Sequence, residues 1–160
     1  MKTLYLVRHA KSSWKFDVID HERPLNERGL EDGPKMAAHI AATMPKPDLL
    51  MSSDALRAKT TAVFFAKAFT IPDTEIILNH KMYDFEGRDL VEVIKSVGDE
   101  VDTLMVFGHN NAMTNFVNSY GDLRVDNVAT AAFTAITFEI HSWQDLIPGK
   151  TIYHKAPKEL

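Results

Sequence analysis

The sequence predicts an α/β domain built as a three-layer sandwich, with a mainly parallel central sheet and helices on both of its faces. Short runs of apolar, strand-forming residues alternate along the chain with segments whose apolar residues recur at helical spacing. That alternation is typical of parallel strands joined by crossover helices. The length of 160 residues, without an internal repeat or a long polar linker, indicates one domain over residues 1–160.

Short apolar segments mark the expected strands. Residues 3–7 are rich in strand formers and are followed by the polar Arg8, a pattern typical of a buried strand. The other expected strands cover residues 48–51, 75–78 and 103–107, followed by a late pair at 133–140 and 151–154. Pro148 and Gly149 separate the late pair, which we expect to form a hairpin or the edge of the sheet.

The first helix is expected to begin after Asn26, because asparagine caps helix N-termini well. Its apolar positions begin with Leu30. Pro34 should kink or delay this helix, since proline lacks the backbone N–H that a helix interior uses. Pro45 and Pro47 end it.

The second helix has the most regular apolar pattern, and Ser53 or Asp54 is expected to cap it. Its stripe comprises Ala58, Thr61, Ala62, Phe65, Ala66 and Phe69. Two further helices are expected over residues 90–97, ending at Gly98, and over residues 112–120.

The composition excludes several classes of protein. Lys and Arg total 18 and Asp and Glu total 22, for a net charge of −4, whereas general nucleic-acid binders rely on positive charge. The absence of cysteine excludes disulfide frameworks, thiolate zinc sites, iron–sulfur clusters and thiol nucleophiles. No apolar run approaches the ~18 residues of a membrane span, and no signal-peptide core stands out. We therefore expect a cytoplasmic monomer that binds neither nucleic acid nor membrane.

Polar residues follow three of the expected strands at the point where each strand ends. They are Arg8-His9, Ser52-Ser53 with Arg57 nearby, and Gly108-His109. Asp84 lies a short loop beyond a fourth strand. Because ligands of such sheets bind at the carboxyl ends of the strands, we expect two histidines, two arginines and an acid to meet at one rim.

This combination suits the transfer of a phosphoryl group. The planar forks of Arg8 and Arg57 match phosphate oxygens. A neutral imidazole is a competent nucleophile, and it is available at pH 7 because its unperturbed pKa is ~6.5. A second histidine can stabilise developing charge, and a carboxylic acid can protonate the leaving group. Each residue taken singly is more often structural or solvated than catalytic, so the spacing alone gives a hypothesis.

Four segments resemble, in order and spacing, the motifs of the histidine phosphatase superfamily. They are residues 6–14 (Leu-Val-Arg-His-Ala-Lys-Ser-Ser-Trp), 23–29, 52–61 and 107–110. The short chain and the Arg-His-Ala-Lys-Ser-Ser-Trp form are most similar to the SixA-type phosphohistidine phosphatases. The resemblance implies a phosphoglycerate mutase-like fold with no large lid insertion, and catalysis without a metal or other cofactor.

The resemblance also implies roles for individual residues. His9 is implied as the nucleophile that becomes phosphorylated, and Arg8, Arg57 and His109 as the phosphate pocket around it. Lys11 and Ser12, just past the nucleophile, are either substrate contacts or solvated surface.

The expected proton donor departs from the usual pattern of the superfamily, in which a Glu follows the third strand. Here that segment offers Asp84, with Glu86 close behind, and each is as readily a loop carboxylate. A phosphoramidate P–N bond is labile and its imidazole leaving group takes a proton from solvent, whereas an alkoxide needs a local donor. An acid at Asp84 or Glu86 would therefore extend the substrates toward phosphate esters.

Three functions remain open at this point. The first is hydrolysis of phosphohistidine in a phosphorylated protein. It suits the open, shallow site expected of a chain that lacks lid-building insertions and whose longest candidate insert lies between Arg8 and Asn26. The second is hydrolysis of small phosphate monoesters, and the third is a non-catalytic phospho-ligand binding module, which would not need a nucleophile. A metal-dependent hydrolase is disfavoured because no ligand spacing is found among the remaining histidines, His21, His39, His80, His141 and His154.

Overall fold

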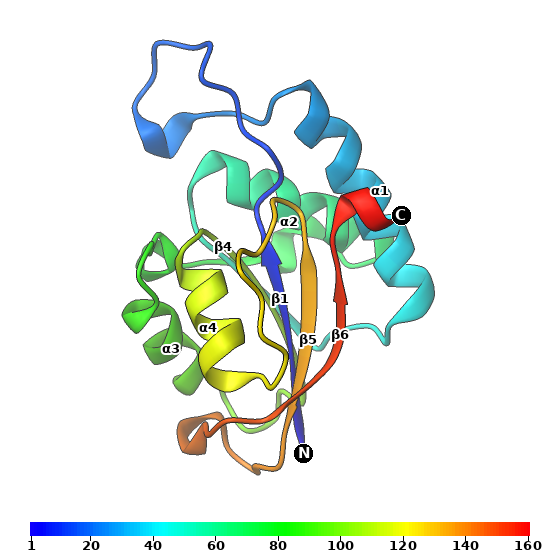
Figure 1. Ribbon diagram of the computed structural model, residues 1–160, viewed down its shortest axis with the longest axis vertical. Coiled ribbons are helices and arrows are strands. Elements are labelled where there is room, and N and C mark those ends of the chain that lie inside the picture. Colours follow the sequence, from blue (N-terminus) through cyan, green and yellow to red (C-terminus); the bar gives the residue numbers. More distant parts are fainter.

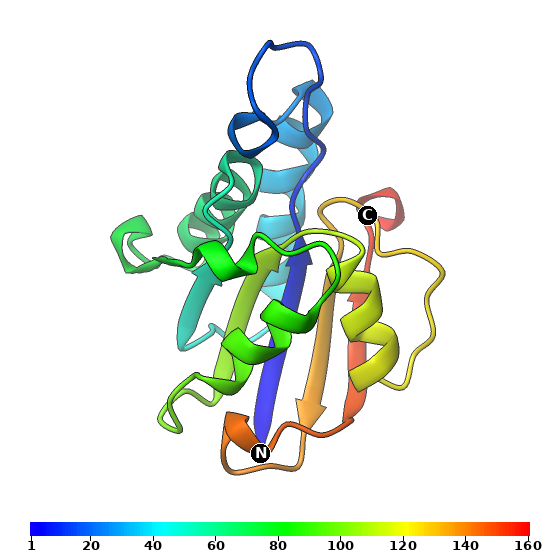
Figure 2. The same ribbon diagram turned by 90° about the vertical axis from the view of Figure 1, so that its left-hand side faces the viewer.

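The middle layer of the computed structural model, which describes residues 1–160, is a sheet of six strands. The strands are β1 (Lys2–Arg8), β2 (Leu49–Ser52), β3 (Ile77–Leu78), β4 (Thr103–Gly108), β5 (Phe133–Phe138) and β6 (Lys150–Lys155). They lie in the order β3-β2-β4-β1-β5-β6 (Figures 1 and 2). The pairs among β1 to β4 are parallel, and β5 pairs antiparallel with β1 and with the edge strand β6. This confirms the mainly parallel sheet and the late pair at its edge.

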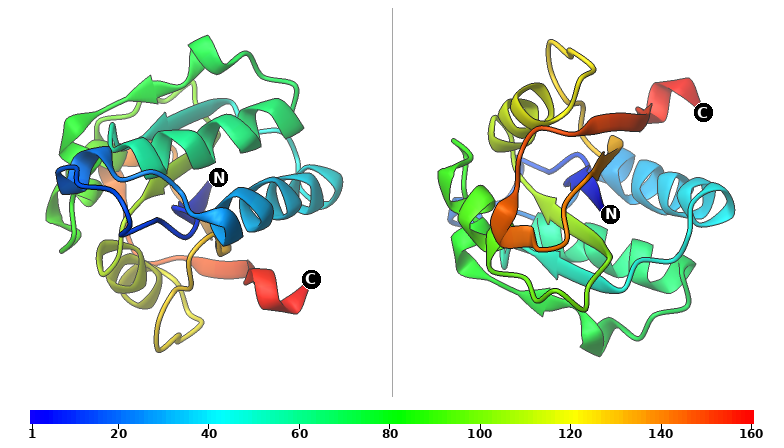
Figure 3. Two further views of the ribbon diagram at one scale, coloured as in Figure 1. Left: turned by 90° about the horizontal axis from the view of Figure 1, so that it is seen from above. Right: turned by 90° about the horizontal axis from the view of Figure 1, so that it is seen from below.

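Helices cover both faces of the sheet, which confirms the three-layer prediction (Figures 2 and 3). Helices α1 (Glu27–Thr43) and α2 (Leu56–Ala68) pack on one face, and α3 (Arg88–Lys95) and α4 (Ala112–Tyr120) pack on the other. The short 3-10 turns are η1 (Asp20–Glu22), η2 (Asp73–Glu75), η3 (His80–Met82), η4 (Trp143–Asp145) and η5 (Pro157–Glu159). None of the helices combines the length and the apolar character that a membrane crossing requires.

Strand β1 runs through the centre of the core and fixes the position of the residues that follow it. Leu4 and Leu6 pack with the α3 and α4 side, whereas Tyr5 and Val7 pack with the α1 and α2 side. Successive side chains of a strand face opposite sides, so both faces of β1 are buried and its sequence is continuously apolar. The end of β1 is therefore held firmly at the carboxyl edge of the sheet.

Helix α1 begins where the sequence predicts but is not delayed by its proline. The side chain of Asn26 accepts a 2.8 Å hydrogen bond from the backbone N–H of Gly29, and the helix runs on through Pro34. Pro34 lies on the exposed side, so the helix loses one hydrogen bond there without burying an unpaired group. Leu30, expected on the apolar stripe, is exposed, and the buried residues of the helix are Gly29, Gly33, Met36, Ala37 and Ile40.

Helix α2 corrects the prediction that Ser53 or Asp54 caps it. Its N-cap is Ala55, which makes no side-chain cap hydrogen bond. The hydroxyl of Ser53 instead accepts the N–H of Ala55 at 3.2 Å, and the carboxylate of Asp54 faces two histidines. Both side chains are thus occupied outside the helix, while the predicted apolar stripe of α2 is buried as expected.

Candidate active site

The carboxyl ends of the parallel strands β1, β2 and β4 lie at one edge of the sheet (Figure 2), and the expected polar residues follow these ends. The backbone N–H of His9 donates to the carbonyl of Gly108 at 3.0 Å, and the N–H of Ser53 donates to the carbonyl of Phe107 at 3.0 Å. These two bonds continue the parallel ladders just beyond the strands. The loop of residues 9–26 rises above this edge of the sheet (Figure 1).

His9 has one ring nitrogen engaged and the other without a protein partner. The residue is 6% exposed, and its Nδ1 lies 2.7 Å from the carbonyl oxygen of Ala10. Because a carbonyl only accepts, a neutral His9 carries its proton on Nδ1 and a lone pair on Nε2. Burial lowers the pKa of His9 to about 3; the Ala10 carbonyl acts in the opposite direction, and neighbouring arginine charges lower it further. His9 is therefore a neutral base at pH 7.

His109 lies against His9, with their ring centres 5.3 Å apart. It is 1% exposed, and its Nε2 lies 2.8 Å from the hydroxyl of Ser53, while its buried Nδ1 has no hydrogen-bond partner. Burial lowers the pKa of His109 to about 2, with His9 and Arg57 next in effect. The hydroxyl of Ser53 already accepts a backbone N–H, so its own proton is free for Nε2.

Arg8 and Arg57 supply more hydrogen-bond donors than the protein uses. Arg8 donates to the carbonyl of Val128 at 2.8 Å, and Arg57 donates to the backbone carbonyl and the carboxylate of Asp20 at 2.7 and 2.9 Å. The Nε of each arginine is buried without a partner. Both arginines line the same cavity, and burial, followed by the charge of Arg57, lowers the pKa of Arg8. Paired cations with unused donors favour an anion between them.

Thr61 connects the loop after β1 to helix α2. Its hydroxyl accepts the backbone N–H of Ala10 at 2.9 Å and donates to the carbonyl of Arg57 at 2.8 Å. Thr61 and its two partners are buried, so this bridge fixes His9 relative to the first turn of α2.

A cavity of about 760 Å³ opens at the rim. It is lined by Arg8, His9, Lys11, Ser12, Ser13, Trp14, Lys15, Asp20, Arg23, Asn26, Arg57, Phe85, Asn110 and Thr130. Lys11 and Ser12, proposed from the sequence as substrate contacts, both lie on this surface. His109 is not among the lining residues, but its ring packs against those of the lining residues His9 and Phe85 and against Tyr83. The cavity is therefore rich in cations and has few apolar walls.

Arg23 lines the cavity, and sequence reasoning assigned it no role in the site. It is 7% exposed, donates to the hydroxyl of Ser12 at 2.7 Å, and stacks its guanidinium 3.5 Å from the ring centre of Trp14. It thereby adds a third arginine beside Arg8 and Arg57. The signal available in the sequence was its place in the second family-like segment, just before Pro24.

Asp20 is the second residue that sequence reasoning missed, because it lies in a loop without periodicity. Its carboxylate accepts hydrogen bonds from Arg57, from Arg23 and from the hydroxyl of Tyr83. Burial raises the pKa of Asp20, but the hydrogen bonds from Tyr83, Arg57 and Arg23 outweigh that effect and hold its pKa well below the usual range. Asp20 is therefore an anion at pH 7 that contacts two of the arginines lining the cavity.

Neither Asp84 nor Glu86 lines the cavity. The carboxylate of Asp84 accepts the backbone N–H groups of Glu86, Gly87 and Leu90, each at 3.0 Å, at the start of α3. Burial raises the pKa of Asp84, but these backbone bonds prevail and lower it. The contacts of Asp84 are those of a structural carboxylate, and Glu86 is exposed, so a proton-donor role for either remains a prediction without support in these contacts.

Family comparison matches residues 4–132 to the model described as the histidine phosphatase superfamily, branch 1. The chain belongs to this superfamily. The match confirms the resemblance inferred from the four motifs. The matched range includes β1, β2 and β4 and the residues that follow them, so the rim of this histidine phosphatase lies within it.

Solved structures share the fold over nearly the whole chain. A candidate phosphohistidine phosphatase SixA from Agrobacterium tumefaciens is 25% identical, with a TM-score of 0.82 and 98% of each chain covered. The protein histidine phosphatase SixA complexed with tungstate has a TM-score of 0.79 at 15% identity, covering 98% of this chain and 97% of that one. These likenesses confirm the expected phosphoglycerate mutase-like architecture without a large lid insertion.

Among curated proteins, an uncharacterized protein of Mycobacterium tuberculosis is 34% identical over 103 residues. The matched region covers 64% of this chain and 62% of that relative, so the chain spans less than two thirds of the relative's length.

Proposed function

We propose that this protein is a phosphatase that transfers a phosphoryl group to Nε2 of His9 and then to water, with no metal in the reacting centre. The observation that carries this proposal is the state of His9. Its Nδ1 is engaged by the Ala10 carbonyl, its Nε2 is unprotonated, and it shares a cavity with two arginines whose Nε atoms have no partner.

In the first step, the lone pair of His9 Nε2 attacks phosphorus, a P–N bond forms, and the bond from phosphorus to the leaving group breaks. The leaving group departs with that electron pair and takes a proton. Arg8 and Arg57 hold the phosphoryl oxygens. His109 does not line the cavity, but its ring lies 5.3 Å from that of His9 and its Nδ1 has no protein partner, so its Nδ1–H donates to the phosphoryl group once that group is bound to His9. The Ser53 hydroxyl donates a hydrogen bond to Nε2 of His109, which keeps the ring proton of His109 on Nδ1.

In the second step, water attacks the phosphorus of phospho-His9. The P–N bond breaks, its electron pair returns to Nε2, and inorganic phosphate leaves after the water loses a proton. The Ala10 hydrogen bond holds the ring in one orientation through both steps, because it engages the nitrogen that does not react. The resting enzyme is thereby restored.

We further propose that the substrate is phosphohistidine in a protein. The cavity lies at the surface and is lined by 14 residues of which few are apolar, so it binds mainly the phosphoryl group. No carboxyl placed to protonate an alkoxide is found at Asp84 or Glu86, whereas an imidazole leaving group takes its proton from solvent. The likeness to SixA-type phosphohistidine phosphatases supports the same choice.

The test compares phosphate release from a phosphohistidine peptide and from p-nitrophenyl phosphate, in the presence of a chelator. The variants are wild type, His9→Ala and the control His141→Ala, which removes an exposed histidine outside the site. We expect wild type and the control to hydrolyse the peptide and His9→Ala to be inactive. Turnover of both substrates would assign a general phosphomonoesterase instead. Saturable phosphate binding by wild type without turnover of either substrate would assign a binding module.

A further inference from the structure

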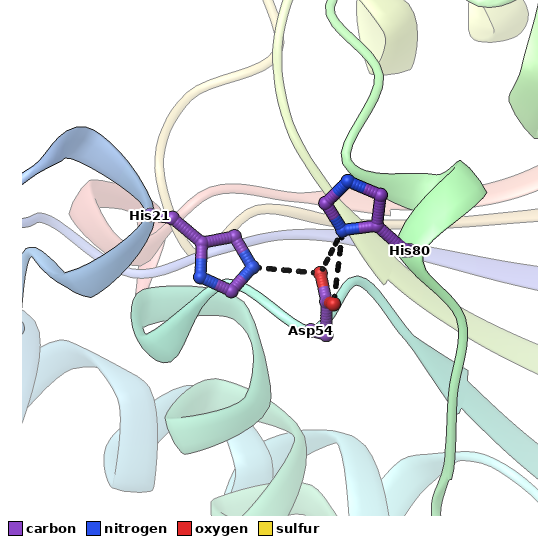
Figure 4. A group of neighbouring side chains, drawn as sticks. All are labelled: His21, Asp54 and His80. Carbon is purple, nitrogen blue, oxygen red and sulfur yellow. Dashed lines mark hydrogen bonds and ion pairs between the residues drawn. The ribbon is translucent and has the colours of Figure 1, made fainter.

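Three polar side chains outside the proposed reacting centre converge on one point. Figure 4 shows His21, Asp54 and His80 facing one another. They come from η1, from the connection between β2 and α2, and from η3. The sequence separations of 33 and 26 residues between Asp54 and the two histidines conceal this cluster from any search for motif spacing.

Both imidazoles point a nitrogen at the same carboxylate. His21 Nε2 lies 2.8 Å from Oδ1 of Asp54, and His80 Nδ1 lies 2.9 Å from Oδ2 and 3.0 Å from Oδ1. Each of the three residues has a potential ligand atom that lies within 4.8 Å of those of the other two. The second nitrogen of each ring has no protein hydrogen bond, so it can hold the ring proton while the facing nitrogen binds a cation.

These distances are close to those around a bound zinc ion. Zn²⁺ bonds to histidine nitrogen and carboxylate oxygen are about 2.0–2.2 Å long, which puts tetrahedral ligand atoms roughly 3.3–3.6 Å apart. Small rotations of the two rings therefore open the centre enough for an ion. The side chains are 30%, 29% and 73% exposed for His21, Asp54 and His80, so water can reach a fourth position.

We propose that His21, Asp54 and His80 form a site for Zn²⁺, with water as the fourth ligand. Two imidazole nitrogens and one carboxylate oxygen are a donor set that zinc favours over Mg²⁺ or Ca²⁺, which prefer oxygen ligands. The expectation of no metal came from sequence spacing and from the family resemblance, and the fold brings together ligands that spacing could not show.

The position of this zinc site gives it a structural role beside the cavity. His21 follows Asp20, which binds Arg57, and Asp54 follows Ser53, which contacts His109. Tyr83 lies beside both ligand rings, with ring-centre distances of 5.0 Å to His21 and 5.7 Å to His80. An ion here ties the loop of η1 to the rim without contributing a group to the reacting centre.

The experiment measures Zn²⁺ binding to metal-free protein by isothermal titration and by competition with a chromophoric chelator, and records the Tm with and without Zn²⁺. The variants are wild type, Asp54→Asn, His80→Ala and the control His141→Ala. His80 is a safe position because its side chain is largely exposed, so loss of binding there is not loss of fold. His9→Ala is included to separate this site from the histidines of the cavity.

We expect wild type, His141→Ala and His9→Ala to bind one equivalent of Zn²⁺ and to gain Tm, because binding stabilises the folded state. His80→Ala and Asp54→Asn should lose both effects, while Mg²⁺ gives neither in any variant. Absence of saturable binding in wild type, unchanged binding in His80→Ala, or loss of binding in His9→Ala would overturn the proposal. If wild type shows no saturable binding, the cluster consists only of two imidazole–carboxylate hydrogen bonds.

Discussion

The carboxylate of Asp20 lies 2.9 Å from the guanidinium of Arg57, so the chain's own acid occupies part of the site proposed for phosphate. The backbone carbonyl of Asp20 accepts from the same guanidinium at 2.7 Å. This second contact does not depend on the side chain. An incoming phosphate therefore meets an Arg57 whose charge is partly neutralised, and it lies close to a negative group.

Replacing Asp20 by alanine is expected to tighten phosphate binding. The backbone contact keeps the loop near Arg57, while the variant removes a repulsion of ~1 kcal/mol, about fivefold in affinity, at the solvent-exposed edge of the site. The measurement is the inhibition constant of inorganic phosphate, with Asp17→Ala as a control for charge in the same loop. Weaker binding in Asp20→Ala would show instead that the carboxylate orients Arg57 for its ligand.

Replacing His9 by alanine is expected to abolish turnover while leaving the circular dichroism spectrum unchanged, since the backbone ladder to Gly108 does not use the ring. Wild type caught during turnover and digested at alkaline pH should carry phosphate on the peptide containing His9. His141→Ala should behave as wild type in both measurements. Full activity in His9→Ala, or phosphate on another histidine, would contradict the proposed nucleophile.

The layers of the fold and the rim could be predicted because both follow from local rules. Continuous apolar runs identify buried parallel strands, and the residues after β1, β2 and β4 must then meet, whatever their separation in sequence. The path of α1 through Pro34 was not predictable in this way. Packing of the buried face of α1 outweighs the one lost hydrogen bond. The usual cost of a proline in a helix does not include that packing, so it could not predict the outcome.

The parts of the site that sequence reasoning missed lie in loops and depend on tertiary contacts. Asp20 acquires its place only when η1 folds back onto α2, and no periodicity marks it. Asp84 was a candidate proton donor because it follows a strand, but the backbone N–H groups of Gly87 and Leu90 donate hydrogen bonds to its carboxylate. The sequence shows that residue 84 carries a carboxylate, but it does not show which groups hydrogen-bond to that carboxylate.

Replacing His109 by alanine is expected to lower the rate about 10²–10³-fold, the usual cost of losing one donor to a developing oxyanion. Ser53→Ala should cost less, because it keeps the imidazole and removes only the hydrogen bond to Nε2. Single-turnover kinetics measures both, with the yield of phospho-His9 showing which step slows. Equal rates for His109→Ala and wild type would remove His109 from the phosphate site.

The buried histidines predict that stability falls in acid. His9 and His109 have folded-state pKa values of about 3 and about 2, against ~6.5 in the unfolded chain, so below pH 6.5 the unfolded state binds more protons. Each residue therefore contributes a loss of ~1.4 kcal/mol per pH unit as pH falls from about 6.5 toward the folded value. Urea unfolding of wild type and His109→Gln across this range checks the prediction, since the variant should show the smaller slope. Imidazole NMR signals of His9 that titrate near pH 6.5 in the folded protein would contradict it.

Replacing Asp84 by asparagine separates the structural role of this residue from a catalytic one. Its carboxylate accepts three backbone N–H groups at the start of α3, and exchanging an oxygen for an amide should lower the free energy of unfolding by about 1 kcal/mol, as loss of a helix cap does. Hydrolysis of a phosphohistidine peptide should keep its wild-type rate, because the imidazole leaving group takes its proton from solvent. Glu86→Gln, which changes an exposed neighbouring carboxylate, should alter neither quantity. A selective loss of p-nitrophenyl phosphate hydrolysis in Asp84→Asn, with stability unchanged, would restore Asp84 as the proton donor.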